Sequence, residues 1–300
     1  MRALALILLL AAPLAAQTPS DRFFFSGDGR LSFHHAHLGS DISVRFRRPD
    51  GSYDPQALAE LQHFFRSRGD NREGRISLRL IELIDFVEQK LQPRRMQLIS
   101  GYRSPEFNDD LRSAGAMAAR ASLHTQGLAA DILFVGVKLR PAWNRLRELR
   151  LGGLGLYQKE GFLHIDTGPP RFWEPQTSKV QEDLSGGNAR LFARTDFDRY
   201  RDLAGARVQL HGVTKLPLRI AREATVGDGA ATVTLEPAEA MNLDGDECLV
   251  LLDPSEVYEA RVAAVHGEIE GRTRLTLRTC PPRLERTLES FASNEIEVSR

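Results

Sequence analysis

The pattern of apolar residues changes after Trp173, and this change limits the folds open to the chain more than any other feature. Before it, apolar residues recur at helical spacing in some stretches and form short continuous blocks in others. From residue 189 onward only short, strand-like blocks remain, separated by turn signals such as "GDG". Mixed patterns are typical of an α+β layer structure, whereas short strands alone are typical of a β-sandwich. The sequence therefore predicts two different domains.

A polar segment at residues 174–188 contains two adjacent glycines and is expected to link the domains. The first domain is predicted over residues 17–173 and the second, an immunoglobulin-like sandwich, over residues 189–300. A length of 300 residues agrees with two domains.

Helices and strands alternate in the first domain. Asp54-Pro55 and Ser104-Pro105 are typical helix starts, because the first residue caps the helix and proline suits its first turn. Helices are expected at residues 55–65, 77–91, 105–119 and 141–150, and short strands at 96–99, 131–135, 151–157 and 161–168.

Residues 1–16 contain one arginine followed by fourteen apolar residues. A membrane-spanning helix needs about 20 such residues, so the segment predicts a cleaved secretory signal peptide. An uncleaved N-terminal anchor is the alternative. No later stretch is long and apolar enough to span a membrane, so no span is expected in the mature chain.

The chain has two cysteines, Cys248 and Cys280, and both lie in strand-like sequence. An exported chain enters an oxidising compartment, so a disulfide between them is predicted, with two buried thiols as the alternative. The 40 basic and 40 acidic side chains balance. This balance gives no reason to expect nucleic acid or an anionic membrane surface as a partner.

The stretch "SLHTQGLAAD" at residues 122–131 places Asp131 directly before an apolar run. A carboxylate is a poor start for a buried strand unless something binds it. His124 lies seven residues earlier, and Gly127 permits a turn between the two. His164, in "GFLHIDTG", is a third possible ligand. A catalytic zinc ion usually has three protein ligands. A hydrogen-bonded structural cluster is the alternative.

Three motifs occur in order: "SGYRSPEFN", "SLHTQGLAAD" and "GFLHIDTG". Together they resemble the YcbK-like murein endopeptidases, which belong to the zinc superfamily of lysostaphin-type peptidases, D-Ala-D-Ala carboxypeptidases and the hedgehog domain. The family pattern Ser-x-His-x-x-Gly-x-Ala-x-Asp is matched at Ser122, His124, Gly127, Ala129 and Asp131. The resemblance covers roughly residues 27–173 and not the C-terminal half.

The resemblance implies a hedgehog-like or D-Ala-D-Ala-peptidase-like domain with a small antiparallel sheet that carries Zn²⁺. It implies that the zinc ligands are His124, Asp131 and His164. Arg103 corresponds to an arginine that binds substrate and stabilises the oxyanion.

Two residues are candidates for the general base. Where related peptidases have a second histidine, this chain has Phe162. Asp166 is the favoured base, with a role in orienting a histidine as the alternative, and Glu160 is the other candidate. Tyr157 is expected to line a substrate groove.

The function implied is hydrolysis of peptide crosslinks in peptidoglycan, with its peptide stems as substrate, in the periplasm. A D,D-carboxypeptidase is one alternative, and a zinc-containing cell-wall-binding module without activity is another. The second domain is expected to contact the cell wall or an unidentified protein.

Three other patterns are given no functional role. His34, His35 and His37 are interpreted as surface histidines. The tripeptide "RGD" at residues 68–70 is interpreted as a chance loop sequence. The glycines of "LGGLG" follow a helix rather than a strand, so they form no phosphate-binding loop.

Overall fold

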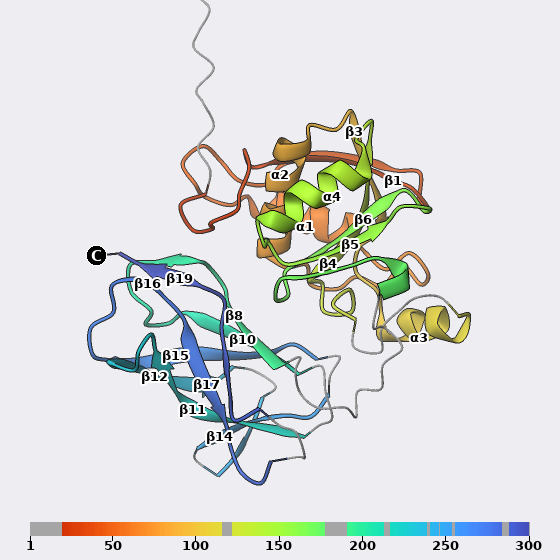
Figure 1. The fold of residues 1–300 in the computed structure, drawn as a ribbon. Coiled ribbons are helices and arrows are strands. Elements are labelled where there is room, and N and C mark those ends of the chain that lie inside the picture. The colour runs from red at the N-terminus through yellow and green to blue at the C-terminus, as the bar shows by residue number, and fades with distance from the viewer. Residues whose placement is uncertain are drawn as a thin grey trace, which may run out of the picture.

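The computed structural model describes residues 20–115, 122–177, 191–212, 217–238, 241–245, 247–253, 256–283 and 288–299. The predicted signal peptide at 1–16 and most of the predicted linker lie outside these residues. The described chain forms two units, each with its own hydrophobic core (Figure 1). Among the described residues, no helix is long and apolar enough to cross a membrane.

The first unit contains a seven-stranded sheet in the order β2-β1-β3-β4-β6-β5-β7. Its strands are β1 (Arg30–His35), β2 (Asp41–Arg45), β3 (Arg95–Ser100), β4 (Ala129–Val135), β5 (Gly153–Tyr157), β6 (Phe162–Asp166) and β7 (Arg171–Trp173). The pairs β1–β3 and β5–β7 are parallel, and the other neighbours are antiparallel. The expectation of a small antiparallel sheet was therefore wrong in size and direction, because β1, β2 and β7 were not recognised from the sequence, and two of these strands add the parallel pairs β1–β3 and β5–β7.

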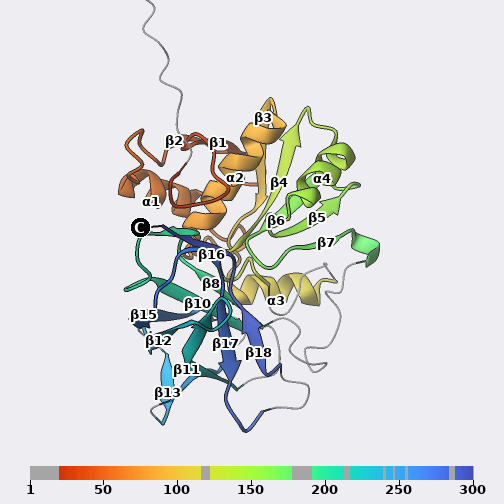
Figure 2. The ribbon, with the colours of Figure 1, turned by 60° about the vertical axis from the view of Figure 1, so that its left-hand side comes forward.

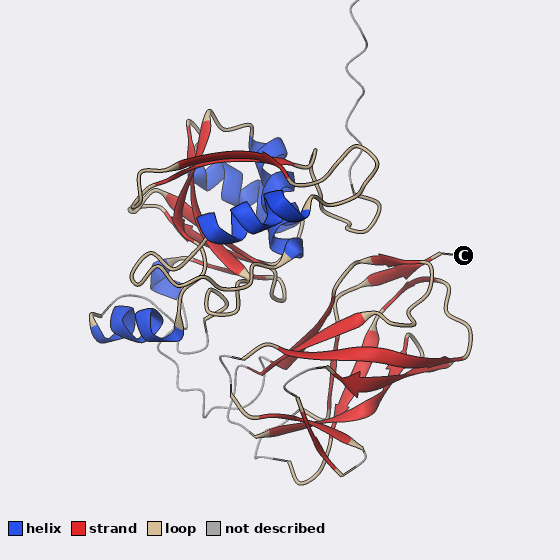
Figure 3. Cartoon of the chain, turned by 180° about the vertical axis from the view of Figure 1, so that it is seen from behind, coloured by secondary structure: helices blue, strands red, loops and turns tan. Residues whose placement is uncertain are grey.

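Helices α1 (Pro55–Phe64), α2 (Leu78–Leu91) and α4 (Leu139–Glu148) lie within the curve of this sheet (Figure 3). Asp54 caps α1 as expected, since its side chain accepts from the backbone N–H groups of Gln56 and Ala57. Buried residues of all three helices pack against the sheet in one core. The first unit is thus α+β, as the sequence predicted.

Helix α3 (Pro105–Ser113) lies apart from the other three, between the end of the first sheet and the second unit (Figure 2). Ser104 caps it by accepting from the N–H of Phe107 at 3.1 Å. Asn108 is its one buried residue. The predicted extension of this helix to residue 119 falls partly on residues 116–121, which lie outside the described part of the chain.

Residues 191–298 contain strands and no helix in the parts that the structure describes. These strands are β8 (Leu191–Thr195), β9 (Arg199–Tyr200), β10 (Arg207–Gly212), β11 (Leu218–Val226), β12 (Ala231–Pro237), β13 (Asn242–Asp244), β14 (Cys248–Leu251), β15 (Tyr258–His266), β16 (Gly271–Thr273), β17 (Leu275–Thr279), β18 (Ser290–Ala292) and β19 (Ile296–Val298). Pairing runs from β8 through β10, β15, β12, β11 and β17 to β18. A bridge between Ala193 and Ser293 then returns to β8. Strands β16, β19 and β9 form a separate three-stranded sheet. The all-β character agrees with the prediction, whereas the immunoglobulin-like arrangement stays a prediction.

The two units share a contact surface rather than meeting only through a link. Leu123, Leu128 and Ala129 of the first unit form a buried cluster with Phe192 of the second. Asp198, buried in the second unit, forms an ion pair with Arg79 at the start of α2. Residues around the predicted metal-binding motif therefore depend on the second unit for part of their burial. The predicted domain limits stay a prediction.

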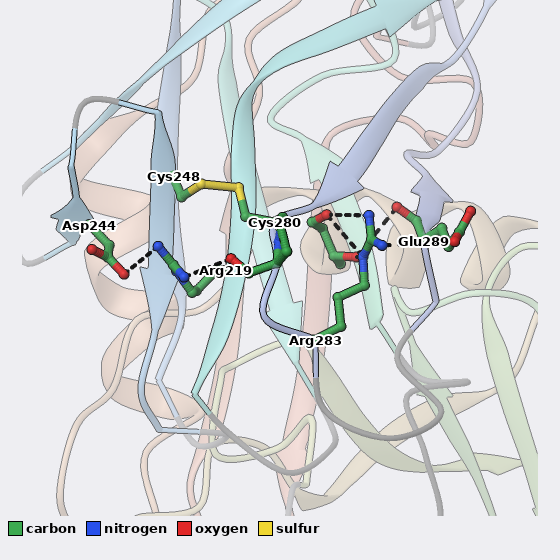
Figure 4. The surroundings of a disulfide bond; sticks show 8 residues. Arg219, Asp244, Cys248, Cys280, Arg283 and Glu289 are labelled. Atoms are coloured by element: carbon green, nitrogen blue, oxygen red, sulfur yellow. Dashed lines mark hydrogen bonds and ion pairs between the residues drawn. A yellow bond between two sulfur atoms is a disulfide. The ribbon is translucent and has the colours of Figure 1, made fainter.

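A disulfide joins Cys248 on β14 to Cys280 after β17, with 6.5 Å between the Cα atoms (Figure 4). Arg219 on β11 lies beside it, and its guanidinium contacts Asp244 at 2.5 Å and the carbonyl oxygen of Pro281 at 2.7 Å. The two cysteines are 32 positions apart in the chain, and the bridge ties β14 to the end of β17.

Replacing both cysteines with serine is expected to lower the free energy of unfolding by about 3–4 kcal/mol, because an open loop has more conformational freedom in the unfolded chain. Chemical denaturation of the double variant and the wild type measures the difference. Alkylation of the denatured, unreduced protein supplies the control. Modification of both cysteines in that control would contradict the predicted bridge.

Candidate metal centre

Two neighbouring strands and one turn bring the predicted ligands together. Asp131 on β4 is paired in register with His164 on the antiparallel strand β6. His124 lies in the turn before β4, where Gly127 has a φ of +64°. A β-carbon at Gly127 would collide with the carbonyl oxygen of Arg75, so only glycine fits this turn. The turn returns His124 to the head of the strand that carries Asp131.

The three ligand atoms form a small triangle. His124 Nε2 lies 3.4 Å from Asp131 Oδ1 and 3.2 Å from His164 Nδ1, and His164 Nδ1 lies 2.9 Å from the same Asp131 oxygen. Zinc bonds of about 2.0–2.1 Å at tetrahedral angles place neighbouring ligand atoms about 3.3 Å apart. The spacing of the triangle fits one metal ion of that size. These residues form the one such group among those that the structure describes.

Hydrogen bonds behind the two imidazoles determine which nitrogen of each ring faces the triangle. His124 Nδ1 lies 2.7 Å from the carbonyl oxygen of Gly101, which can only accept, so Nδ1 carries the proton and Nε2 is free to bind a metal. His164 Nε2 lies 3.0 Å from Asp166 Oδ2, which leaves Nδ1 for the metal. Outer partners of this kind orient metal-binding histidines in many proteins.

All three ligands are buried, with exposed fractions of 2% for His124, 5% for Asp131 and 8% for His164. Burial, together with the charge of Arg103, lowers the pKa of His124 to about 4. Burial alone would raise the pKa of Asp131, but His124 and Arg103 hold it well below its usual value. A neutral imidazole beside an ionised carboxylate is the protonation state that a metal ion requires.

Asp166 lies on the far side of the His164 ring from the ligand triangle. It is fully buried, and both of its oxygens accept hydrogen bonds. Oδ1 accepts from the backbone N–H groups of Gly153 and Gly168, and Arg171 contacts both oxygens. Burial would raise the pKa of Asp166, but the Arg171 guanidinium and His164 hold it far below the usual range. This position and charge differ from those expected of a general base.

Arg103 lies beside Asp131 of the ligand triangle. Its guanidinium donates to Asp131 Oδ2 at 2.7 Å and to Ser100 Oγ at 3.0 Å. The side chain is 13% exposed. A fixed cation thus lies directly beside the ligand triangle.

Tyr157 lies at the same site and stacks on Phe162, with 4.5 Å between the ring centroids. Burial raises the pKa of Tyr157, and the charge of Asp131 contributes to this shift. Trp173 completes the aromatic surface, with its ring centroid 5.0 Å from that of His164 and its Nε1 donating to Tyr157 at 3.4 Å. Both aromatic side chains are only partly buried.

The glycines of "LGGLG" have a structural role that sequence reasoning missed. A β-carbon at Gly153 would collide with the carboxylate of Asp166, and one at Gly155 would meet the Trp173 ring at 2.7 Å. Glycines that recur within a strand pattern are a known sign of close approach by another group. Here they make room for the residues that surround His164.

The interpretation of all three N-terminal histidines as surface residues was wrong for His35. Its side chain is fully buried at the end of β1, and its Nδ1 accepts weakly from the N–H groups of His37 and Leu38 at 3.3 Å. Burial lowers the pKa of His35 to about 4. His37 is exposed, as expected.

Comparison with known proteins agrees with this geometry. A family described as peptidoglycan L,D-endopeptidase MepK matches residues 26–173. Peptidoglycan L,D-endopeptidase MepK of Escherichia coli (strain K12) is 37% identical over 144 residues, which are 48% of this chain and 79% of that protein. The probable peptidoglycan L,D-endopeptidase MepK of Haemophilus influenzae is 30% identical over 146 residues, which are 48% of this chain and 78% of that protein. No solved structure matches the chain.

The region that the family matches contains the ligand triangle, Arg103 and the aromatic surface, and it ends at Trp173. The strands from β8 onward lie outside it. Identity of 37% and 30% over more than three quarters of the length of these two relatives is too extensive to reflect shared motifs alone. This chain belongs to the family of peptidoglycan L,D-endopeptidases MepK.

Proposed function

We propose that this protein is a zinc-dependent endopeptidase that hydrolyses peptide crosslinks of peptidoglycan. The observation that carries the proposal is the buried triangle of His124, Asp131 and His164 with Arg103 beside it. Two imidazoles and one carboxylate are a common ligand set for catalytic zinc, which leaves a position open for the reaction. The ligands come from a strand pair and a turn that are rigid parts of the fold.

The chemistry that a zinc ion supplies in such a site is polarisation of a peptide carbonyl and activation of water near neutral pH. Arg103 supplies a permanent positive charge where negative charge develops on the carbonyl oxygen during attack. Because Arg103 is held by Asp131 and Ser100, its orientation is already fixed before substrate binds. Tyr157 and Trp173 offer an aromatic surface against which a peptide can pack.

Asp166 acts in this proposal by orienting His164 rather than as the general base. Its Oδ2 holds the Nε2–H of His164 and thereby presents Nδ1 to the metal. Its remaining acceptor sites are occupied by Arg171 and by two backbone N–H groups. Glu160, the other candidate base, is exposed in the turn before β6.

Asp166→Asn is expected to weaken zinc binding by about 10- to 100-fold, because a neutral amide holds His164 less firmly. Added zinc should then restore most of the activity. Titration with a competing chelator measures the affinity, and Glu160→Gln serves as the matched control. Unchanged zinc affinity together with a kcat that excess zinc does not restore would instead identify Asp166 as the base.

Residues 26–173 are proposed to share the fold of the hedgehog and D-Ala-D-Ala-peptidase domains, on the strength of the three motifs and the sheet that carries them. The protein is proposed to act outside the cytoplasm, in the periplasm, because its relatives are named for peptidoglycan cleavage. The β8–β19 unit is proposed to contact the cell wall or a protein.

Digestion of purified peptidoglycan with and without chelator tests the function. The expected result is conversion of crosslinked dimers to monomers, lost with chelator and restored by zinc. Monomers shortened by one residue would indicate a D,D-carboxypeptidase instead. Zinc-dependent binding to peptidoglycan without any product would indicate the non-catalytic module.

A further inference from the structure

The loop after α1 is fastened to the segment that carries Arg103. The N–H of Tyr102 donates to the carbonyl oxygen of Phe65 at 2.8 Å, and Ser104 Oγ donates to Asp70 Oδ2 at 2.5 Å. Gly69 packs so closely on Phe107 of α3 that a β-carbon there would collide with the ring. The "RGD" tripeptide is therefore a structured part of the site's border.

Arg68 extends from this loop with its guanidinium over the Phe107 ring, 5.5 Å from the ring centroid. Its Nε is buried and has no hydrogen-bond partner within the part of the chain that the structure describes. No carboxylate among those described residues forms an ion pair with it. Arg103 at the ligand triangle and Arg171 behind it are each already bound to an aspartate.

Arg68 lies at the edge of the metal centre, because its loop is bonded to the segment that carries Arg103, and the N–H of Arg103 donates to the carbonyl oxygen of His124 at 3.2 Å. Burial lowers the pKa of Arg68, the neighbouring charge of Arg103 lowers it further, and the carboxylate of Asp131 opposes both. Arg68 in turn contributes to the lowered pKa values of His35 and His37 at the end of β1. Arg68 thus lies at the border of the metal centre, and within the described part of the chain no carboxylate forms an ion pair with it.

From this arrangement we infer that Arg68 binds a free carboxylate of the substrate peptide, next to the scissile bond. The inference rests on the proposed function. A partly desolvated guanidinium without an anionic partner gains most from a ligand that supplies one, and its planar fork matches a carboxylate with two parallel hydrogen bonds. The Phe107 ring holds the guanidinium plane in place while leaving its N–H groups free to donate. Arg103 stabilises charge on the carbonyl oxygen of the scissile bond, whereas Arg68 binds the carboxylate next to that bond.

The test uses two synthetic crosslinked peptides that differ at one group. One has a free carboxylate on the residue next to the scissile bond, and the other has a carboxamide there. The zinc-loaded full chain is compared with Arg68→Gln, Arg68→Lys and the control Arg66→Gln. Arg66 lies two residues earlier, and its guanidinium donates to the backbone carbonyl oxygen of His63.

Wild type is expected to cleave the free acid with a kcat/KM about 10- to 100-fold above that for the carboxamide, mostly through KM, as expected for a hydrogen bond between charged groups. Arg68→Gln should lose this preference. Its kcat/KM for the free-acid peptide should fall to the wild-type value for the carboxamide peptide, and its kcat/KM for the carboxamide peptide should stay at the wild-type value. Arg68→Lys should retain part of the preference, and Arg66→Gln should match wild type. Zinc content should be unchanged in all variants.

Two results would overturn the inference while leaving the proposed function intact. One is equal cleavage of both peptides by wild type, and the other is an equal loss by Arg68→Gln on both peptides. If Arg68→Gln does not fold, the preference for the free-acid peptide, measured for wild type and Arg68→Lys, still tests the inference. Failure of the zinc-loaded wild type to cleave either peptide would instead refute the proposed function, and the inference with it.

Discussion

Replacing His124 or Asp131 with alanine is expected to remove both the bound metal and crosslink cleavage. Each variant leaves two of the three protein ligands, which is too few for a catalytic zinc site. Loss of the metal's contribution, several kcal/mol at the transition state, corresponds to a fall in rate of about a thousandfold or more. Asp131→Ala also leaves Arg103 without its carboxylate partner.

Metal analysis by plasma mass spectrometry and chromatography of the digestion products measure both effects in one preparation. His63→Ala is a suitable control, because His63 is an exposed histidine on α1 whose Nδ1 lies 2.7 Å from Glu73. Circular dichroism checks that each variant is folded. Stoichiometric zinc in either site variant, or wild-type activity that is indifferent to chelator, would contradict the assignment of the metal centre.

Arg103→Gln is expected to keep its zinc and to lower kcat by about 100- to 1,000-fold. The guanidinium is placed to stabilise charge that develops only during the reaction, and removal of such a donor typically has an effect of this size. The kcat of Arg103→Lys should lie between those of wild type and Arg103→Gln or equal that of Arg103→Gln. An ammonium group does not reproduce the planar fork that reaches both Asp131 and Ser100.

Steady-state kinetics on a crosslinked peptide, with zinc content determined in parallel, distinguishes this role from metal binding. Arg112→Gln on α3 is the control, since Arg112 pairs with Asp109 on the same helix. A large rise in KM with unchanged kcat would show that Arg103 binds the ground state of the substrate rather than the transition state.

The sequence alone determined the features that local chemistry controls. The caps at Asp54 and Ser104 start α1 and α3 where predicted, because a capping side chain bonds to backbone within three residues of itself. The three candidate metal ligands were predicted from short motifs, and the structure brings all three together. A ligand motif contains both the metal-binding residue and the glycines that shape its turn, so it can be recognised without knowing the fold.

Tertiary structure decided the features that depend on which strands become neighbours. The pairing of β1 with β3 buries His35, although its surrounding sequence reads as polar. The alignment of β5 with β6 brings the N–H of Gly153 to one carboxylate oxygen of Asp166, and the other oxygen lies beside His164.

Arg68 owes its position beside the metal centre to contacts between two loops that are more than 30 residues apart in the chain. Burial, charge and access to substrate are properties of the neighbours that a residue acquires on folding. The sequence therefore determined which residues can bind the metal, and only the tertiary structure decided what surrounds them.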